Sequence, residues 1–515
     1  MTTGSSKIPS VLIVGAGPVG LTLAAELARY GVPVRIIDKV AQPTDKSRAV
    51  VVWGRTLELL DRMGCAGGFV AAGIRASAAH LISSQDHGRP DQAIRIDFGL
   101  LTNPFPYALM LPQSGTERLL TEHLAGLGVS IERSVELTQL RQDKDGVEAE
   151  LRHLDGQVET MRVAWLAGCD GAHSNTRKLI GQRFSGHTFP TEWLMADLNL
   201  QGLSTPPGEP ALFFHGDGIL ALFPIGPDNL YRLAANLGPA LEEGRGSDVS
   251  LAEIQALITR RGPTDLIATR SSWHATFRIN ERQVETYRSE RVFLVGDAAH
   301  IHSPAGGQGM NTGMQDAVNL AWKLALICRG DVELNAGGQK LLDSYDIERR
   351  AVGTQTLRVA GRMTALGLMK HPLTQGVRNR IAKLVMRWRP VQHALARQLS
   401  GLTVQYRVSD LNGFGRRGSR APLRAGQRFP MTARSREIDR LPRFQLAGEI
   451  TPTEAARLAS LFPKLLQPDI ATASAMLPTG RLWLLRPDGY VALATGTGDS
   501  AAIAAYLARL ERDRF

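Results

Sequence analysis

The sequence has few cysteines, and they form no recognisable pattern. Three occur in 515 residues, at Cys65, Cys169 and Cys328, and none belongs to a CxxC motif. An odd, widely spaced set excludes a disulfide framework and argues against a metal site, and it is typical of a reducing compartment. We therefore expect a cytoplasmic protein without a structural metal.

Long apolar runs, internal repeats and low-complexity tracts are also absent. Residues 11–28 have the apolarity of a signal-peptide core, but their glycine spacing and the strand that follows argue against a signal peptide. No other segment approaches the length of a bilayer-spanning helix, so we expect no membrane span.

The charge excess is modest and has no cluster. There are 60 basic and 49 acidic residues, which give a net charge of +11 and a pI near 9.8. Such an excess can indicate nucleic acid as a partner. Here the basic residues are spread thinly and are mostly arginines on predicted helix faces, so we expect an ordinary solvated surface and no nucleic-acid partner. The length indicates about two to four domains.

The clearest motif lies near the N-terminus. An apolar strand, 11–14, runs into Gly15-x-Gly17-x-x-Gly20, then a helix and a second strand that ends at Asp38. In such a unit the three glycines make the tight turn, admit a pyrophosphate and let the helix pack on the strand. Asp38 follows Gly15 by 38 − 15 = 23 positions, where an acid binds ribose hydroxyls. This stretch predicts a dinucleotide site.

A second glycine-rich stretch comes much later in the chain. Residues 292–295 predict a buried strand that ends at Gly296-Asp297, and a loop from Pro304 to Gly309 then leads into a helix. A strand tip, bare backbone N–H groups and a helix N-terminus suit an anionic, planar, multi-ring ligand. Two distant segments would then close over one cofactor.

Three further positions keep two interpretations each. Asp170-Gly171 follows a predicted strand and precedes a helix, which favours a ligand-facing turn over a simple hairpin turn. Arg48 can bind a pyrophosphate or be a surface arginine. Gln113 can bind the cofactor or cap a helix.

The remaining chain predicts mostly scaffold. Residues 72–110 and 186–280 predict strands of an antiparallel sheet, and 374–399 a docked amphipathic helix kinked at Pro390. The Pro/Gly/Arg-rich residues 412–428 predict a linker before a C-terminal unit, in which the segment Arg486-Pro-Asp-Gly489-Tyr490 predicts a hairpin turn. Pocket-lining candidates in the sheet, each more often a core residue, are Trp193, Phe213, Phe214, His215, Phe223, Tyr231 and Trp273.

With these motifs in order, the chain resembles the FAD-dependent aromatic hydroxylases, the class A flavoprotein monooxygenases built like p-hydroxybenzoate hydroxylase. The resemblance covers most of residues 10–360. It implies an α/β fold: a Rossmann-like FAD-binding domain of the GR2 type, an inserted antiparallel β-sheet substrate domain and a C-terminal thioredoxin-like domain. The implied divisions are 1–185 with 281–375 for FAD, 72–110 with 186–280 for substrate, 376–411 as a helical connection and 412–515 for the thioredoxin-like domain. That last domain contains no cysteine, which excludes thiol redox chemistry there.

The resemblance also implies residue roles. Asp38 would bind the adenosine ribose, Asp297 the ribityl chain, and Arg48 the pyrophosphate, while Pro304 and Gly307 lie against the isoalloxazine. Pro304, Gly307 and Arg48 are the positions we expect closest to the chemistry. The implied cofactor-binding residues are Gly15, Gly17, Pro18, Gly20, Asp38, Lys39, Arg48, Gln113, Asp170, Gly171, Gly296, Asp297, Pro304, Gly307, Gly309, Met310 and Asn311.

The implied activity is monooxygenation that uses NAD(P)H and O₂. In this family NAD(P)H binds transiently and reduces FAD, and a flavin C4a-hydroperoxide then hydroxylates a phenolic or polycyclic aromatic substrate. Phenol hydroxylases carry an acid before the Arg-Thr-Leu-Glu segment, where this chain has Val50-Val-Val-Trp53, and this difference favours a larger polycyclic substrate. Baeyer–Villiger or epoxidising oxygenation of a polyketide or antibiotic remains an alternative, as does an interaction protein with an idle flavin fold. A homodimer is compatible with the sequence.

Overall fold

The computed structural model describes residues 10–43, 49–83, 93–239, 249–367, 384–386, 388–413, 423–430, 440–471, 477 and 479–512. A six-stranded sheet forms the first layer, in the order β18-β19-β12-β1-β2-β8. All neighbours are parallel except β18 and β19. The strands are β1 (Val11–Val14), β2 (Val34–Asp38), β8 (Ile131–Arg133), β12 (Trp165–Gly168), β18 (Arg288–Ser289) and β19 (Val292–Leu294).

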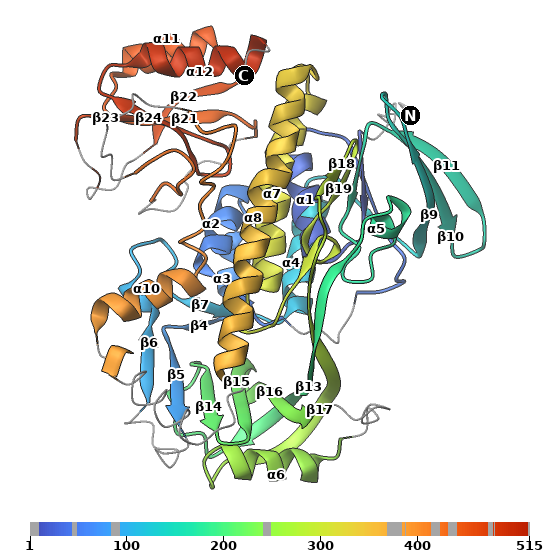
Figure 1. Ribbon diagram of the computed structural model, residues 1–515, viewed down its shortest axis with the longest axis vertical. Helices are drawn as coiled ribbons and strands as arrows, with labels where there is room; N and C mark the ends of the chain where they lie inside the picture. The colour runs from blue at the N-terminus through green and yellow to red at the C-terminus, as the bar shows by residue number, and fades with distance from the viewer. Residues whose placement is uncertain are drawn as a thin grey trace.

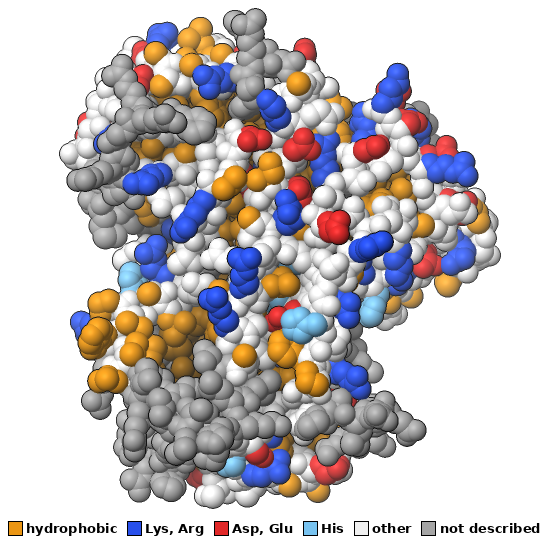
Figure 2. Space-filling model, viewed as in Figure 1, with side chains coloured by type: hydrophobic (Ala, Val, Ile, Leu, Met, Phe, Trp, Pro, Cys, Tyr) orange, Lys and Arg blue, Asp and Glu red, His pale blue; other side chains and the backbone are white. Residues whose placement is uncertain are grey.

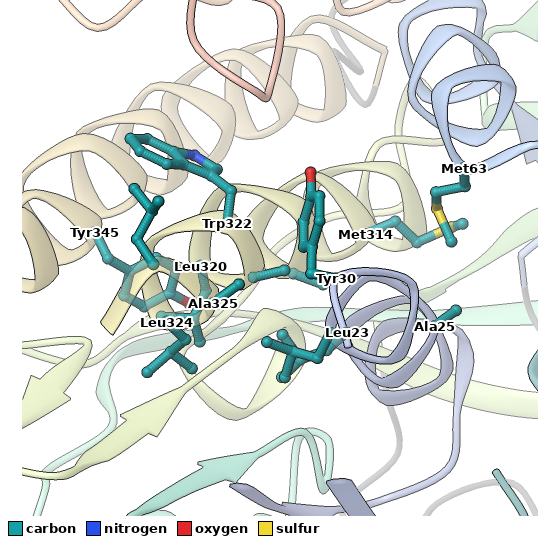
Figure 3. Close-up of a cluster of buried hydrophobic side chains, with 14 of the residues drawn as sticks. Leu23, Ala25, Tyr30, Met63, Met314, Leu320, Trp322, Leu324, Ala325 and Tyr345 are labelled. Carbon is teal, nitrogen blue, oxygen red and sulfur yellow. The ribbon is translucent and has the colours of Figure 1, made fainter. Parts of the chain in front are cut away.

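Helices cover this sheet and bury its apolar strands. The helices α1 (Pro18–Arg29) and α7 (Gly309–Cys328) pack against each other, and α8 (Ala336–Gly367) packs on α7. Figure 3 shows side chains of these helices meeting in the core, among them Leu23, Leu320, Trp322 and Tyr345. Strands buried on both faces are expected to be continuously apolar, as Val11–Val14 is. Between β8 and β12 along the chain, three strands form an antiparallel meander that no sequence pattern indicated. They are β9 (Val135–Gln142), β10 (Val147–His153) and β11 (Val158–Val163).

The second layer is an eight-stranded sheet in the order β20-β17-β13-β16-β15-β14-β5-β6. One face packs on α6 (Leu251–Arg261), as Figure 1 shows. Phe213 and Tyr231 belong to that packed face, so they are core residues and not pocket residues. The strands are β5 (Ala78–Ser83), β6 (Ile94–Asp97), β13 (Ser185–Gln201), β14 (Ala211–His215), β15 (Gly218–Gly226), β16 (Leu230–Pro239), β17 (Ile267–Gln283) and β20 (His300–Ile301).

A small three-stranded sheet and four helices accompany the two large sheets. Phe223 of β15 packs with Trp53, Phe98 and Leu399 in a separate apolar cluster beside this sheet. The other predicted pocket-lining residues have different surroundings. Trp193 and Phe214 belong to another apolar cluster, and His215 is hydrogen-bonded to Asp217. The Arg232 guanidinium lies over the Trp273 ring. The strands of the small sheet and the four helices are β3 (Val51–Val52), β4 (Ile74–Ala76), β7 (Ala108–Met110), α2 (Gly54–Met63), α3 (Ala66–Ala72), α4 (Gln113–Gly126) and α5 (Asn175–Leu179).

The predicted helix over 374–399 is wrong in two respects. Pro390 lies in the first turn of a separate helix, α10 (Arg389–Leu399), where its missing N–H costs nothing, so it starts a helix instead of kinking one. Leu384, Val385 and Trp388 are exposed, with 63%, 40% and 66% of their surface accessible, so these three do not dock. Figure 2 shows hydrophobic side chains gathered on the surface where α10 lies in Figure 1. Residues 374–383 and 387 lie outside the described residues.

The C-terminal unit is a four-stranded sheet in the order β22-β21-β23-β24, with α11 (Pro452–Leu461) and α12 (Ser500–Arg512) together on one side (Figure 1). The predicted hairpin turn is confirmed, because Arg486 N–H donates to the Tyr490 carbonyl at 2.8 Å and Gly489 has a φ of 78°. The thioredoxin-like assignment stays a prediction. The strands are β21 (Phe444–Gly448), β22 (Leu466–Ala471), β23 (Arg481–Leu485) and β24 (Val491–Gly496). The strand predicted over 470–476 begins earlier, at Leu466, and residues 472–476 lie outside the described residues.

Across the part of the chain that the structure describes, no helix is both long and apolar enough to cross a bilayer.

Candidate functional site

Four strand ends bring the three sequence motifs to one edge of the first sheet. Val14 of β1 lies beside Gly168 of β12 and Ile37 of β2, and Gly168 lies beside Leu294 of β19. Parallel strands end on the same side, so the turns after β1, β2, β12 and β19 are neighbours. Ligands of open parallel sheets bind at such an edge.

The turn after β1 has space for a ligand at one glycine and no spare space at the other two. A Cβ on Gly15, whose φ is 104°, would lie 2.5 Å from the Cys169 carbonyl oxygen, and one on Gly20 would lie 1.9 Å from the Gly15 carbonyl oxygen. A Cβ on Gly17 would meet no atom within 4 Å. Gly17 is also the N-cap of α1, which has no side-chain cap and begins at Pro18. Open space before an uncapped helix N-terminus suits a pyrophosphate.

Asp38 is anchored to this turn. Its Oδ2 accepts the Ala16 N–H at 2.7 Å and its Oδ1 accepts the Val40 N–H at 2.9 Å, while Arg133 Nη1 lies 3.9 Å from Oδ2. The half-buried carboxylate is thus held at the end of β2, where the sequence predicts a ribose contact. Lys39, the next residue, is exposed.

Asp170 shapes its own loop. Its carboxylate accepts Ser174 Oγ–H at 2.5 Å, and Thr176 N–H and Oγ1–H at 2.9 and 3.0 Å. Gly171 has a φ of 75° and open space around its Cα, so it is the member of the pair better suited to approach a ligand. Arg177, which no sequence pattern indicated, donates to the carbonyls of Ala172 and Ala298 and so ties this loop to the turn after β19.

The turn after β19 and the glycine loop approach the N-terminus of α7. Asp297 is exposed, and Gly296 has a φ of 62°. In the loop the Gly307 N–H donates to the Pro304 carbonyl at 2.9 Å. Gly309 is the first residue of α7, and the N-cap Gln308 directs its side chain to the Gly306 and Leu399 carbonyls and not to the helix. The first N–H groups of a 20-residue helix therefore have no side-chain cap.

Asn311 holds the loop in place. Its Oδ1 accepts the Trp53 N–H at 2.8 Å, and its Nδ2 donates to the Val51 and Gly307 carbonyls at 2.8 and 2.9 Å. Trp53 Nε1 donates to the Gly306 carbonyl at 3.0 Å. The side chains of Asn311 and Trp53 thus position the loop against β3. Because the Asn311 amide already makes three hydrogen bonds, it has little capacity for the cofactor contact that the sequence predicts. Met310 is partly buried against the main core.

Of the two other predicted cofactor contacts, Gln113 and Arg48, the structure describes only Gln113. Gln113 begins α4, and its Nε2 donates to Glu117 Oε1 at 2.8 Å. Burial raises the pKa of Glu117 even though Gln113 opposes that shift. Arg48 lies outside the described residues, so its predicted role stays a prediction.

The residues of this edge fit FAD. An open glycine at one helix N-terminus, an anchored acid at the adjacent strand end and a second uncapped helix N-terminus match a pyrophosphate, a ribose and an electron-poor ring. A pocket that is partly open to solvent lies beside Ala305 and Gly306, between α8 and the end of α10. None of the described residues that line it is ionisable. Its polar groups come from three threonines and four glutamines, namely Gln308, Gln315, Gln355 and Gln398.

Two histidines precede the loop. His300 Nε2 lies 2.8 Å from Asp316 Oδ2, and the His300 and His302 rings are stacked 6.3 Å apart. His302 Nδ1 lies 2.7 Å from the Ser303 carbonyl, so Nδ1 carries the proton. Burial, and then the charge of His300, lower the pKa of His302 to about 4, so its ring is neutral at pH 7.

We expect His302 to make stability pH-dependent. Its pKa is lower in the folded than in the unfolded chain, where it is about 6.5, so the unfolded chain binds the proton first. Stability from this group is present above about pH 6.5 and falls towards pH 4, with a loss of about 2 kcal/mol between pH 7 and 5. Urea unfolding of wild type and His302→Gln should show a flatter pH dependence in the variant. Replacing the exposed His173 by Gln is the control, and an equal slope in all three proteins would contradict this assignment.

Comparison with known proteins agrees with this geometry. Residues 9–360 match the family model described as the FAD binding domain. The chain is 37% identical to 6-methylpretetramide 4-monooxygenase of Streptomyces rimosus, over 94% of this chain and 90% of that protein. Among solved structures, it is similar to the anhydrotetracycline hydroxylase OxyS of Streptomyces rimosus (TM-score 0.76, 30% identity, 97% of this chain and 99% of that one). It is also similar to CabE, an aromatic hydroxylase from angucycline biosynthesis (TM-score 0.75, 29% identity, 97% and 99%). The chain therefore belongs to the FAD-binding-domain family and is an FAD-dependent monooxygenase of the aromatic hydroxylase type.

Proposed function

We propose that this protein uses NADH or NADPH and O₂ to hydroxylate an uncharged, multi-ring phenolic substrate. The observation that carries the proposal is the pocket beside Gly306, which has hydrogen-bonding amides and hydroxyls but no ionisable group among its described residues.

The residues would divide the work of holding the cofactor. Gly17 and the N-terminus of α1 bind the pyrophosphate, Asp38 the adenosine ribose, and Asp297 the ribityl chain. The FAD held by these residues would supply the chemistry for activating O₂ and for oxygen transfer to the substrate ring. The N-terminus of α7 stabilises negative charge on the flavin ring, and the Pro304–Gly307 backbone, held by Asn311 and Trp53, fixes its plane.

Water has to be kept from this reaction, and the apolar cluster beside the loop serves that purpose. Trp53, Phe98, Met110, Phe223 and Leu399 belong to it, and a Cβ on Gly307 would lie only 3.3 Å from Val51 of the same cluster. A dry site prevents reduced oxygen species from being lost to solvent before transfer.

The pocket also argues for the substrate class. A carboxylate taken out of water needs a cation, and the described lining residues contain no lysine or arginine. The relatives act, by their names, on 6-methylpretetramide and anhydrotetracycline, and a tetracycline-like multi-ring molecule has the neutral hydroxyl and amide groups that four glutamines can bind.

A matched substrate panel tests this class. Purified protein loaded with FAD should oxidise NADH or NADPH in air faster with a neutral polycyclic phenol, such as a hydroxyanthracene. The same ring system bearing a carboxylate should be at least about tenfold less effective in kcat/KM, which corresponds to about 1.4 kcal/mol. Gln355→Arg, which adds a cation to the wall, should narrow that difference. Equal stimulation by both substrates would refute the proposed substrate class. A lactone product would show that the enzyme performs a Baeyer–Villiger oxidation in place of hydroxylation, and an epoxide product would show that it performs an epoxidation.

We also propose that the protein works in a reducing, cytoplasmic setting. All three cysteines are free, and burial raises the pKa of Cys65 and Cys328 to about 12, so these thiols are poor nucleophiles.

A further inference from the structure

The hairpin turn of the C-terminal unit is inserted into the FAD-binding part of the protein. Arg486 is fully buried, and its Nη1 and Nη2 donate to Glu348 Oε1 and Oε2 of α8 at 2.6 and 2.9 Å. Its Nη2 also donates to Asp488 at 2.7 Å, and Arg55 of α2 donates to the Asp488 carbonyl at 2.6 Å. An arginine from beyond residue 440 thus neutralises a carboxylate in the core of the flavin domain.

The same turn packs against a buried tyrosine, Tyr406. The Tyr490 ring packs against the Tyr406 ring with 4.3 Å between centroids and 36° between ring planes, and the Arg486 guanidinium lies 4.9 Å from the Tyr406 ring. Tyr406 belongs to the segment after α10, and only 3% of its surface is exposed. The C-terminal turn therefore fixes the position of the Tyr406 ring.

Tyr406 is linked to the ribityl-binding turn through an ion pair. Its hydroxyl accepts Arg349 Nη1–H at 3.1 Å, and Arg349 Nε donates to Asp316 Oδ1 at 2.5 Å. The other oxygen of Asp316 accepts the Gly296 N–H at 3.3 Å and faces His300 Nε2 at 2.8 Å. Gly296 directly precedes Asp297.

The ion pair is sensitive to its surroundings. Both side chains have no exposed surface. Burial alone would raise the pKa of Asp316, but Arg349 and His300 hold it below its usual value. In a low-dielectric interior the geometry of such a pair depends on every hydrogen bond that orients it, and Arg349 has two others, to Tyr406 and to the Thr312 carbonyl of α7.

We infer that the Arg486–Tyr490 turn acts as a positioning element for FAD, because through Tyr406, Arg349 and Asp316 it holds the Gly296–Asp297 turn in the conformation that binds the ribityl chain. This inference rests on the proposed placement of FAD at that turn. It assigns a role to a C-terminal unit that has no thiol chemistry of its own. Tyr406, Arg349 and Asp316 act through the turn, so they are positioning residues.

A pair of tyrosine-to-phenylalanine substitutions tests the inference. Tyr406→Phe keeps the ring contact with Tyr490 and removes only the hydroxyl that orients Arg349. Tyr506→Phe is the matched control, because it removes an equally buried hydroxyl, bonded at 2.8 Å to the Leu411 carbonyl, which lies outside the connection to Asp316. Tyr490→Leu removes the aromatic ring that packs against Tyr406.

The readouts are the Kd for FAD of the apoprotein, from flavin fluorescence well below the unfolding temperature, and the visible circular dichroism of the bound flavin. Tyr406→Phe and Tyr490→Leu should raise Kd by about fivefold or more and alter the flavin dichroism, in line with the loss of a hydrogen bond to a charged group. Tyr506→Phe should leave both unchanged at a similar unfolding temperature. Equal effects of Tyr406→Phe and Tyr506→Phe, or unchanged flavin dichroism, would overturn the inference. A wild-type protein that binds no FAD would refute the proposed function instead.

Discussion

Gly17→Ala is expected to abolish FAD binding while leaving the apoprotein as stable as wild type. A Cβ at this position meets no protein atom within 4 Å, and the backbone, with φ −78° and ψ −177°, is open to alanine. The same methyl group would occupy the space through which the backbone approaches the pyrophosphate. We expect Kd for FAD to rise at least about 100-fold, or about 2.7 kcal/mol, with an unchanged unfolding temperature of the apoprotein.

Gly126→Ala is the control for this substitution. Like Gly17, Gly126 would have nothing within 4 Å of an added Cβ, but it is the last residue of α4, far along the chain from the turn. Flavin titration and thermal unfolding of the two apoproteins separate the outcomes. If Gly17→Ala retains wild-type affinity for FAD, the pyrophosphate does not lie at this turn.

Arg486→Met is expected to have the largest effect on stability. It leaves Glu348 and Asp488 buried without the guanidinium that both carboxylates share, and Lys323 remains as the neighbouring cation of Glu348. Removing one partner of a buried ion pair costs about 3–5 kcal/mol. Urea unfolding should therefore show a much lower midpoint, or an early separate transition of the C-terminal unit.

Two comparisons make this prediction specific. The double variant Glu348→Gln/Arg486→Met removes both charges and should recover part of the loss. Arg457→Met breaks an exposed ion pair with Glu454 on α11 and should leave the midpoint unchanged. Equal effects of Arg457→Met and Arg486→Met would show that the inserted turn does not hold the two parts together.

The local elements of the site could be predicted because their signals are local. The β1–α1–β2 unit is encoded by an apolar run, three spaced glycines and a terminal acid, all within 28 residues of one another. The turns after β12 and β19 were also recognisable as strand ends, and a parallel sheet necessarily places such ends together.

The long-range partners could not be predicted, because no local pattern records them. Asn311 bonds to Trp53 across 258 positions, and Arg428 bonds to Glu58 across 370. An isolated asparagine in a glycine loop is compatible with cofactor contact or with positioning, and only the fold shows that its amide is already in use. The same limit applies to Pro390, which starts a helix or kinks one depending on whether residues before it are helical.

With bound FAD, this protein is expected to transfer one atom of O₂ to an aromatic ring. The most direct measurement is the product of the FAD-loaded protein incubated under ¹⁸O₂ with NADPH or NADH and a neutral polycyclic phenol. We predict a hydroxylated product that contains one ¹⁸O atom, formed with about one reduced nicotinamide consumed per product. A product whose new oxygen comes from water, or no product from a protein that binds FAD and oxidises nicotinamide with every phenol tested, would contradict this account.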